Sequence, residues 1–220
     1  MKRIPMIVLA LSGLLFSTLG IAAGIGVGVK AGTLGLGVEV TKGFTPTING
    51  RLGLNNYKID ASGTESDIDY DADLKLDSVA ALVDWHPLSG GFRASAGVLI
   101  NNNKLDMTAK AATSYDIGGT TYTPAEIGTF AGSVTFDDMA PYIGIGWGNA
   151  VEQGQRLTFA IDVGVLMQGT PKVDLTSTGG TLSSNPAFQA NLATEEQQLQ
   201  DSLNDYDMYP VISLGLAYQF

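Results

Sequence analysis

The sequence contains no cysteine, and charged residues make up only 15% of its 220 positions. Without cysteine the chain is not a small secreted domain held together by disulfides, and it has no thiolate nucleophile. It also has a single histidine, His86, so a cluster of histidines spaced to hold a metal is excluded. After residue 23 there is no apolar run long enough for a membrane helix.

Basic residues are also scarce. The chain has 12 Lys and Arg against 22 Asp and Glu, for a net charge of -10. Lys2 and Arg3 lie in a segment that we expect to be removed, which leaves 10 basic residues against 22 acids, or -12. So acidic a chain is a poor ligand for phosphate backbones, and we expect no nucleic-acid partner.

The N-terminus has the pattern of a cleaved secretory signal. Lys2 and Arg3 precede the apolar run "IPMIVLALSGLLFSTLGIAA", which ends among small residues, Gly20, Ala22 and Ala23. The alternative is a single membrane anchor, but the uninterrupted core is short and no basic stop-transfer cluster follows. We predict a signal peptide at residues 1–23, cleaved after Ala22 or Ala23.

Beyond residue 23, apolar residues recur at every second position, which is the period of β-strands. At the C-terminus Ile212, Leu214, Leu216, Tyr218 and Phe220 share one face, and small or polar residues share the other. The same alternation predicts eight strands, at residues 24–30, 36–44, 48–57, 79–85, 92–102, 139–147, 157–167 and 212–220. Residues 24–220 are therefore expected to form one all-β domain.

Eight strands with one apolar face fit either a soluble β-sandwich or an outer-membrane barrel, in which the apolar face turns outward. The non-apolar face is largely Gly, Ala and Ser, which suits a narrow lumen, and short connections mostly alternate with long ones. Aromatic residues also collect near the short connections, and the predicted aromatic girdle is Phe44, Trp85, Phe92, Trp147, Phe159, Tyr218 and Phe220. We predict an eight-stranded antiparallel transmembrane β-barrel with periplasmic termini.

The last long connection, residues 175–207, carries a helical pattern. Asn185 is placed to cap a helix and Pro186 suits its first turn. Phe188, Leu192, Leu199 and Leu203 follow at steps of four, seven and four, as on one face of an amphipathic helix. We predict a short amphipathic helix at residues 186–204 in the last extracellular loop. It would either pack over the barrel rim or act as a gate or receptor surface.

Three stretches carry a resemblance to a known family. Ala140-Pro141-Tyr142 leads into a Gly-alternating strand in "MAPYIGIGWG", the turn "GTPKV" at residues 169–173 leads into "DLT", and the chain ends on the aromatic strand "YPVISLGLAYQF". These features resemble the CarO-like small outer-membrane proteins, chiefly over residues 118–220. The resemblance implies an eight-stranded outer-membrane barrel. It also implies uptake of small, often basic, amino-acid-like solutes, and a terminal Phe read by the barrel-assembly machinery.

The same alternation places charges inside the barrel. The predicted lumen charges are Lys30, Glu39, Arg51, Asp84, Arg93, Asp138 and Asp162, with Tyr142 among them. The interior of an eight-stranded barrel is just wide enough for side chains to fill, so these charges must pair. We expect the cross-strand pairs Glu39 with Arg51 and Asp84 with Arg93. They form either a structural plug or a narrow conduit whose pairs exchange.

A second acidic stretch is "SDIDYDADLKLD". The predicted acidic mouth consists of Asp67, Asp69, Asp71, Asp73 and Asp77, which alternate on one strand face. The spacing suggests calcium, but the Gly of a calcium loop is missing and a strand cannot wrap an ion, so no metal is expected. A solvated acidic wall above the membrane remains, and it would concentrate cations near the barrel entrance.

No enzyme motif is present. His86 lies in a turn at the end opposite to an outer rim, and there is no G-x-S-x-G turn; "GTLGLG" lies between two strands rather than before a helix. We therefore predict no catalysis and no cofactor. Two functions remain: passive entry of small cationic or zwitterionic solutes, or a non-conducting barrel that displays its loops. The expected partners are outer-membrane lipid and lipopolysaccharide, the assembly machinery and possible solutes.

Overall fold

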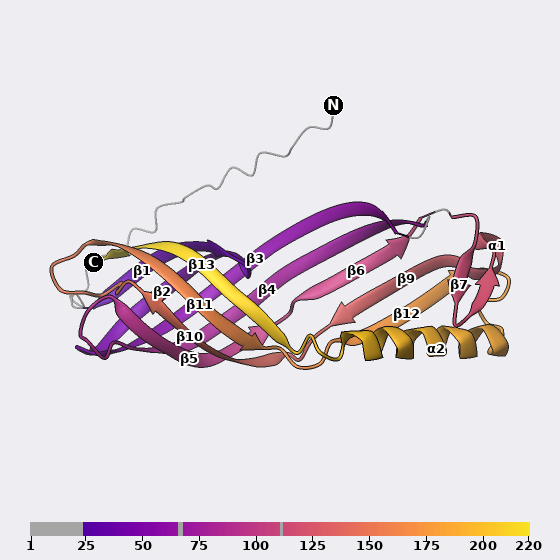
Figure 1. Ribbon diagram of the computed structural model, residues 1–220. Helices are drawn as coiled ribbons and strands as arrows, with labels where there is room; N and C mark the ends of the chain where they lie inside the picture. Colours follow the sequence, from indigo (N-terminus) through magenta and orange to yellow (C-terminus); the bar gives the residue numbers. More distant parts are fainter. Residues whose placement is uncertain (1–23, 66–67, 111) are drawn as a thin grey trace, which may run out of the picture.

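The computed structural model describes residues 24–65, 68–110 and 112–220, so the predicted signal peptide lies outside the described residues. The described residues form thirteen strands and two helices (Figure 1). The strands are β1 (Ile25–Gly32), β2 (Gly35–Thr45), β3 (Ile48–Glu65), β4 (Ile68–Trp85), β5 (Phe92–Asn101), β6 (Lys104–Ala109), β7 (Tyr115–Ile117), β8 (Thr120–Tyr122), β9 (Gly128–Thr135), β10 (Met139–Trp147), β11 (Leu157–Met167), β12 (Lys172–Gly179) and β13 (Met208–Gln219). The helices are α1 (Pro124–Ile127) and α2 (Pro186–Leu203).

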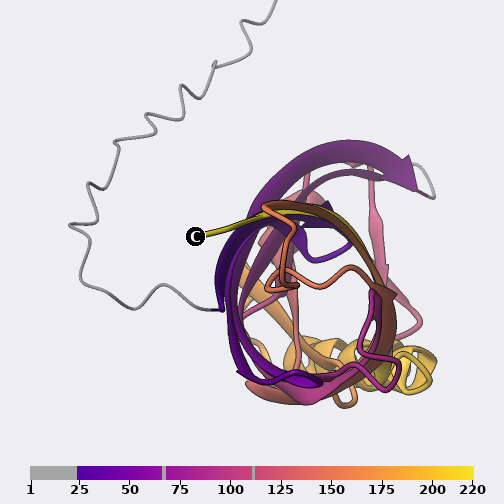
Figure 2. The ribbon, with the colours of Figure 1, turned by 90° about the vertical axis from the view of Figure 1, so that its left-hand side faces the viewer.

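Eight strands close into an antiparallel barrel. Around the ring they run β1, β2, β3, β4, β5, β10, β11 and β13, and β13 pairs with β1 to complete it. Figure 2 shows the barrel from one end, with its strands curving round a central axis. Each of the eight predicted strands coincides with one of them, so the predicted fold class, an eight-stranded antiparallel transmembrane β-barrel, is confirmed.

The outer face of the barrel is a continuous apolar band. Side chains such as Val38, Leu54, Ile143 and Leu216 are about half exposed, although they are aliphatic. The side chains of their strand neighbours, for instance Glu39 and Tyr142, point inward, because successive side chains on a strand alternate between its faces. No helix among the described residues has the length and apolarity needed to cross a bilayer.

Strands β3 and β4 have 18 residues each, more than the 9–11 that a membrane-spanning strand needs. Their far halves, residues 57–65 and 68–76, leave the ring and continue into a second part of the same sheet. There the order is β3, β4, β6, β9 and β12 (Figure 1). We call these five strand segments the wall. The sequence predicted an acidic strand standing above the membrane at residues 67–77, but not the strands β6, β9 and β12 that pair beside it.

Three bends connect strands of the barrel with strands of the wall. They lie between β5 and β6, between β9 and β10, and between β11 and β12. At the first, Asn103 accepts a hydrogen bond from the backbone N–H of Asp77 at 2.9 Å, which satisfies the β4 backbone where its partner changes. At the third, Gly169 has φ +72°, and a Cβ there would lie against the Asp137 carboxylate, so the bend requires glycine.

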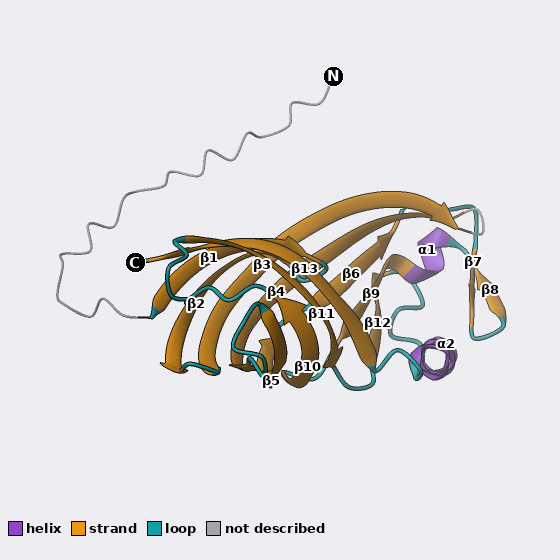
Figure 3. Cartoon of the chain, turned by 60° about the vertical axis from the view of Figure 1, so that its left-hand side comes forward, coloured by secondary structure: helices purple, strands orange, loops and turns teal. Residues whose placement is uncertain are grey.

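The wall has one apolar and one polar face. Helix α2 packs against β12 on the apolar face, with Phe188 and Leu192 buried beside Leu175 (Figure 3). The predicted helix is therefore present, capped by Asn185. It does not lie over the barrel rim: it covers the outer edge of the wall, where Glu196 and Gln200 accept hydrogen bonds from β12 backbone N–H groups. Leu199, predicted on the apolar face, is partly exposed.

Candidate functional site

The centre of the lumen holds a network of ion pairs around Arg51. Its guanidinium lies 2.9 Å from Asp84 Oδ1 and 3.2 Å from Asp162 Oδ2, and 3.6 Å from Glu39 Oε2. Asp84 and Glu39 come from β4 and β2, the two strands next to β3, whereas Asp162 comes from β11, so its contact with Arg51 crosses the lumen. Ser95 donates to Asp84 at 2.5 Å and Ser213 donates to Asp162 at 3.4 Å. The network ties together strands that are not neighbours in the ring.

Three basic and three acidic residues balance in this network. Lys30 lies 3.3 Å from Glu39 Oε2, and Arg93 lies 2.7 Å from Asp162 Oδ1 and also donates to the Gly148 carbonyl. All six side chains are nearly inaccessible to solvent, with Lys30 the most exposed at 12%. A buried charge is tolerated only when paired. The described lumen network is neutral as a unit, and its members depend on one another.

One expected pair is present and the other is replaced. Glu39 lies within ion-pair distance of Arg51, as expected. Asp84 does not pair with Arg93, because the register places Asp84 opposite Ser95 and places Arg93 opposite Gly146. Gly146 in turn lies opposite Asp162, and a Cβ at Gly146 would come within 2.8 Å of Asp162 Oδ1. The missing side chain lets Arg93 reach Asp162 instead.

The lumen end near the chain termini is closed by amide and imidazole groups. Asn49 donates from Nδ2 to Asn149 Oδ1 and lies 3.0 Å from His86 Nε2. The His86 Nδ1 lies 2.9 Å from the Gly90 carbonyl, so the arrangement fits a ring protonated at Nδ1 that accepts from Asn49. His86 is fully buried. Its contacts account for it as a structural residue, and among the described residues no group of acidic, His or Cys side chains is placed to bind a metal.

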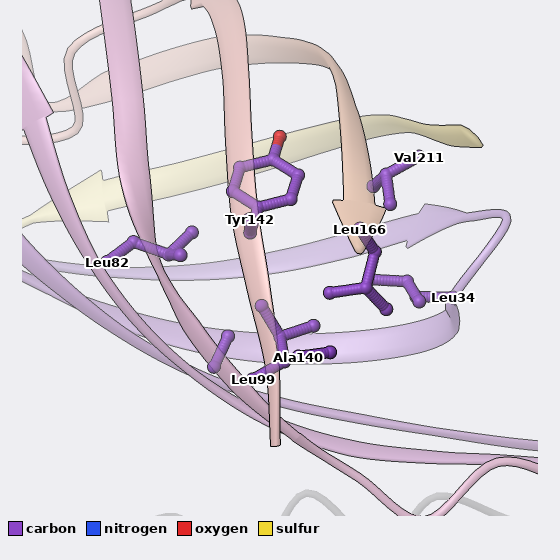
Figure 4. Packing of buried hydrophobic residues seen from close by; sticks show 8 residues of the cluster. Leu34, Leu82, Leu99, Ala140, Tyr142, Leu166 and Val211 are labelled. Carbon is purple, nitrogen blue, oxygen red and sulfur yellow. The ribbon is translucent and has the colours of Figure 1, made fainter. Parts of the chain in front are cut away.

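The other end of the lumen is closed by an apolar plug, which the sequence analysis missed. The plug consists of Leu34, Ala80, Leu82, Leu99, Ala140, Tyr142, Leu166 and Val211, all buried (Figure 4). Leu34 comes from the turn between β1 and β2, which Tyr209 holds by donating to the Thr33 carbonyl at 2.7 Å. The available signal was three large inward residues, Leu82, Leu99 and Leu166, on faces that otherwise carry small or polar ones.

Little space remains between the network and the plug. A cavity of about 20 Å³ lies there, bordered by Arg51, Leu82, Tyr142 and Asp162. That is about enough for one water molecule. Glycine makes room for the Tyr142 ring, since a Cβ at Gly144 or Gly164 would come within 2.5 Å of its hydroxyl. The lumen is therefore packed with side chains along the network and the plug.

The acids of the predicted mouth do not surround the lumen entrance. Asp71, Asp73 and Asp77 have the same parity as the outward Val79, so they lie on the polar, outer face of the wall. They are also partnered there: Asp71 by Lys110 at 2.7 Å, and Asp73 by Lys58 at 3.6 Å. Of the remaining two, Asp69 lies on β4, and Asp67 lies outside the described residues.

The remaining predicted site residues are the lumen charge Asp138 and the seven aromatic residues of the girdle. Asp138 is exposed at the bend before β10 and does not belong to the buried lumen network. The girdle residues lie at the short-turn end and are exposed or, for Phe92, half-buried; they are Phe44, Trp85, Phe92, Trp147, Phe159, Tyr218 and Phe220. Tyr218 and Phe220 stack edge to face at 5.2 Å. Aromatic residues at one end of an apolar band fit an interface between membrane and water.

A closed ring of eight antiparallel strands with an apolar exterior and a plugged polar interior defines a small transmembrane β-barrel. Within that class, the chain has the CarO-like fold. The crystal structure of Acinetobacter baumannii CarO2 superposes with a TM-score of 0.60 at 24% identity, covering 90% of this chain and 99% of that one. The crystal structure of Acinetobacter baumannii CarO gives 0.57 at 22% identity, covering 90% and 98%.

The sequence comparisons add nothing to this, since no protein-family model and no curated protein sequence matches the chain. The likeness is one of fold. It confirms the predicted resemblance to CarO-like proteins, and it extends beyond residues 118–220, where the sequence carried the resemblance, to nine tenths of the chain.

Proposed function

We propose that this protein is an outer-membrane barrel that is closed at rest and displays the wall outside the cell. The observation that carries the proposal is the packing of the lumen. The charge network fills its middle, the plug closes the wall end, and the cavity between them is about 20 Å³. A barrel closed in this way serves as an anchor, and its accessible surface is the wall with α2.

The energetics of the network support a barrel that stays closed. A charged solute passing through must separate Arg51 from Asp84 on the adjacent strand β4 or from Asp162 on β11 across the lumen. Breaking a buried pair on one side costs about 3–5 kcal/mol, because the remaining charge is left without a partner. The plug must open in the same event, since Leu99 and Leu166 are completely buried.

Passive entry of small cationic or zwitterionic solutes is the second candidate. One observation favours it: Arg51 lies within ion-pair distance of three carboxylates, so it can exchange partners without being left unpaired. A solute ammonium group could then replace a guanidinium beside Asp162 while the plug opens. Solute flux through the reconstituted barrel separates the two candidates.

We also propose that the termini lie on the periplasmic side and that the last strand directs assembly. Both terminal strands end beside the short turns, and Phe220 is two thirds exposed beside Tyr218. A strand with an outward apolar face and a terminal aromatic residue is available to the assembly machinery before the ring closes on β1. Neither proposal involves catalysis or a cofactor.

Cysteine labelling tests the orientation, because the chain has no cysteine of its own. Ala193→Cys lies on the exposed side of α2, and Leu88→Cys lies in the turn between β4 and β5, where Leu88 is 78% exposed. On intact cells a membrane-impermeant maleimide should label Ala193→Cys and leave Leu88→Cys unlabelled.

After the outer membrane is permeabilised, both variants should label equally, which controls for folding and reactivity. Labelling of Leu88→Cys on intact cells, with Ala193→Cys protected, would reverse the proposed orientation. Equal labelling of both on intact cells would show that the chain does not separate two compartments.

A further inference from the structure

The polar face of the wall carries its charges in rows. The strand register places Lys58 opposite Lys75, Lys75 opposite Lys104, and both Lys104 and Lys172 opposite Thr135. We call Lys58, Lys75, Lys104 and Lys172 the lysine row. Two residues farther from the barrel, the register aligns Asp60, Asp73, Asp106 and Asp174, with Ser133 between the last two, and we call these the aspartate row.

Aligning like charges is unfavourable within a sheet, because residues directly opposite each other on neighbouring strands repel. Pairs between the rows offset part of this: Lys104 and Lys75 lie 2.7 and 2.9 Å from Asp106, and Lys58 lies 2.8 Å from Asp60. The contacts from Lys104 and then Lys75 lower the pKa of Asp106. The lysine side chains still remain 40–66% exposed, so their ammonium groups are available to a further anion.

The lysine row keeps a constant distance, measured along the strands, beyond the apolar band. Leu54, Val79 and Ile100 are aligned across β3, β4 and β5 as the last outward apolar residues, and the lysine on each of these chain segments follows four positions farther out. Four residues rise about 13 Å along a strand, or about 10 Å along the barrel axis at a tilt near 40°. Flexible lysine side chains can reach back from there into the headgroup layer of a bilayer.

Below the lysine row the outer face is hollowed. A hollow of about 810 Å³ lies over β11, β13, β1, β2, β3 and β4, lined mostly by outward apolar side chains that include Val38, Leu54 and Leu216. Its polar edge is formed by Asn56 and Asp77, and each is two residues from a member of the lysine row. The apolar hollow therefore borders directly on the cationic lysine row, just as the acyl chains of a lipid border on its headgroup.

We propose that the hollow and the lysine row together hold a lipid whose headgroup carries phosphate monoesters. Its acyl chains lie in the hollow, and its phosphates lie on Lys58, Lys75 and Lys104. A phosphate monoester carries a charge of about -1.5 to -2 and three acceptor oxygens, more than any one of the carboxylates that the lysines now contact.

A second copy of the chain fits this face poorly. Two barrels standing side by side in one membrane have their rows at the same height, so lysine would face lysine and aspartate would face aspartate. The phosphate layer of a lipid leaflet, in contrast, is of one sign, and flexible lysine side chains can reach it from slightly different heights. The inference assumes the bilayer placement proposed above, but it does not depend on whether the lumen conducts.

Native mass spectrometry of the mature chain in detergent tests the proposal, with lipid A carrying two phosphates as the probe. The row variant is K58Q/K75Q/K104Q, and the matched control K42Q/K110Q/R156Q removes three cations elsewhere. At about 1 kcal/mol per lysine the row variant would lose roughly 100-fold in affinity, and at least tenfold after competition from the aspartates. The control should change less than threefold, and lipid A with one phosphate should bind more weakly than the probe.

A second variant moves the other way. D60N/D73N/D106N frees the lysines and should bind the probe more tightly than the unmodified chain. Unchanged binding in the row variant, or equal losses in row variant and control, would overturn the proposal. Displacement of the probe by millimolar inorganic phosphate would show a free-anion site instead. If the row variant fails to fold, binding of the probe to D60N/D73N/D106N is the test. Weaker binding of the probe to that variant than to the unmodified chain also overturns the proposal. None of these outcomes bears on the closed lumen.

Discussion

Asp162→Ala should lower the free energy of unfolding by about 3–5 kcal/mol, the usual loss when one partner of a buried ion pair is removed. Asp162 lies 2.7 Å from Arg93 and 3.2 Å from Arg51. Without it the lumen network changes from neutral to a net charge of +1, and Arg93 keeps only its hydrogen bond to the Gly148 carbonyl. Urea unfolding in lipid vesicles, followed by the fluorescence of Trp85 and Trp147, gives the difference.

Two further variants test whether the loss of stability comes from the unbalanced charge in the buried network. Asp162→Ala combined with Arg93→Leu leaves Lys30 and Arg51 against Glu39 and Asp84, so it should recover about half of the loss. Asp60→Ala removes an exposed carboxylate from the wall and should leave the free energy of unfolding nearly unchanged. A loss below about 1 kcal/mol in Asp162→Ala would show that the network does not hold the barrel together.

Leu99→Ala should destabilise the barrel by about 2–5 kcal/mol. Leu99 is completely buried in the plug, where the register places it between Ala80 of β4 and Ala140 of β10 (Figure 4). Its neighbours belong to different strands whose backbones are fixed by pairing, so the space that it leaves cannot collapse fully. The same unfolding experiment measures the effect.

The neighbouring residue provides the matched control. Val98 lies on the same strand but points outward, and it is 42% exposed on the apolar band. Val98→Ala should cost less than about 1 kcal/mol, because lipid fills the space that the methyl groups leave. Equal effects at the two positions would contradict a packed interior at this level of the lumen.

The barrel could be predicted from sequence because its signal is local. Ile212, Leu214 and Leu216 alternate with small residues, and this alternation alone sets which side of β13 faces outward. The strand β6 also alternates, with Lys104 and Asp106 against Leu105 and Met107, but six residues between two polar stretches read equally well as a loop. Its role as a strand depends on pairing with β4 and β9, which no local pattern specifies.

The contacts inside the lumen were harder to predict, because most of them depend on which strands face each other across the ring and not on a local pattern. Glu39 and Arg51 lie on adjacent strands, so their pairing followed from sequence order. Arg93 and Asp162 meet across β10, over Gly146, and this requires the stagger of the whole ring. Asp71, Asp73 and Asp77 share one face of β4, but that face points outward along the wall, because β4 continues straight from the lipid-facing side of the barrel.

Solute flux tests the closed lumen most directly. Liposomes containing the purified mature chain, with a large porin as a positive control for reconstitution, are challenged with glycine, ornithine and a neutral sugar, and swelling is recorded. The packed network and plug predict swelling no faster than in protein-free liposomes for all three solutes. Entry of ornithine or glycine at a rate that rises with protein content would contradict a closed barrel and favour solute uptake.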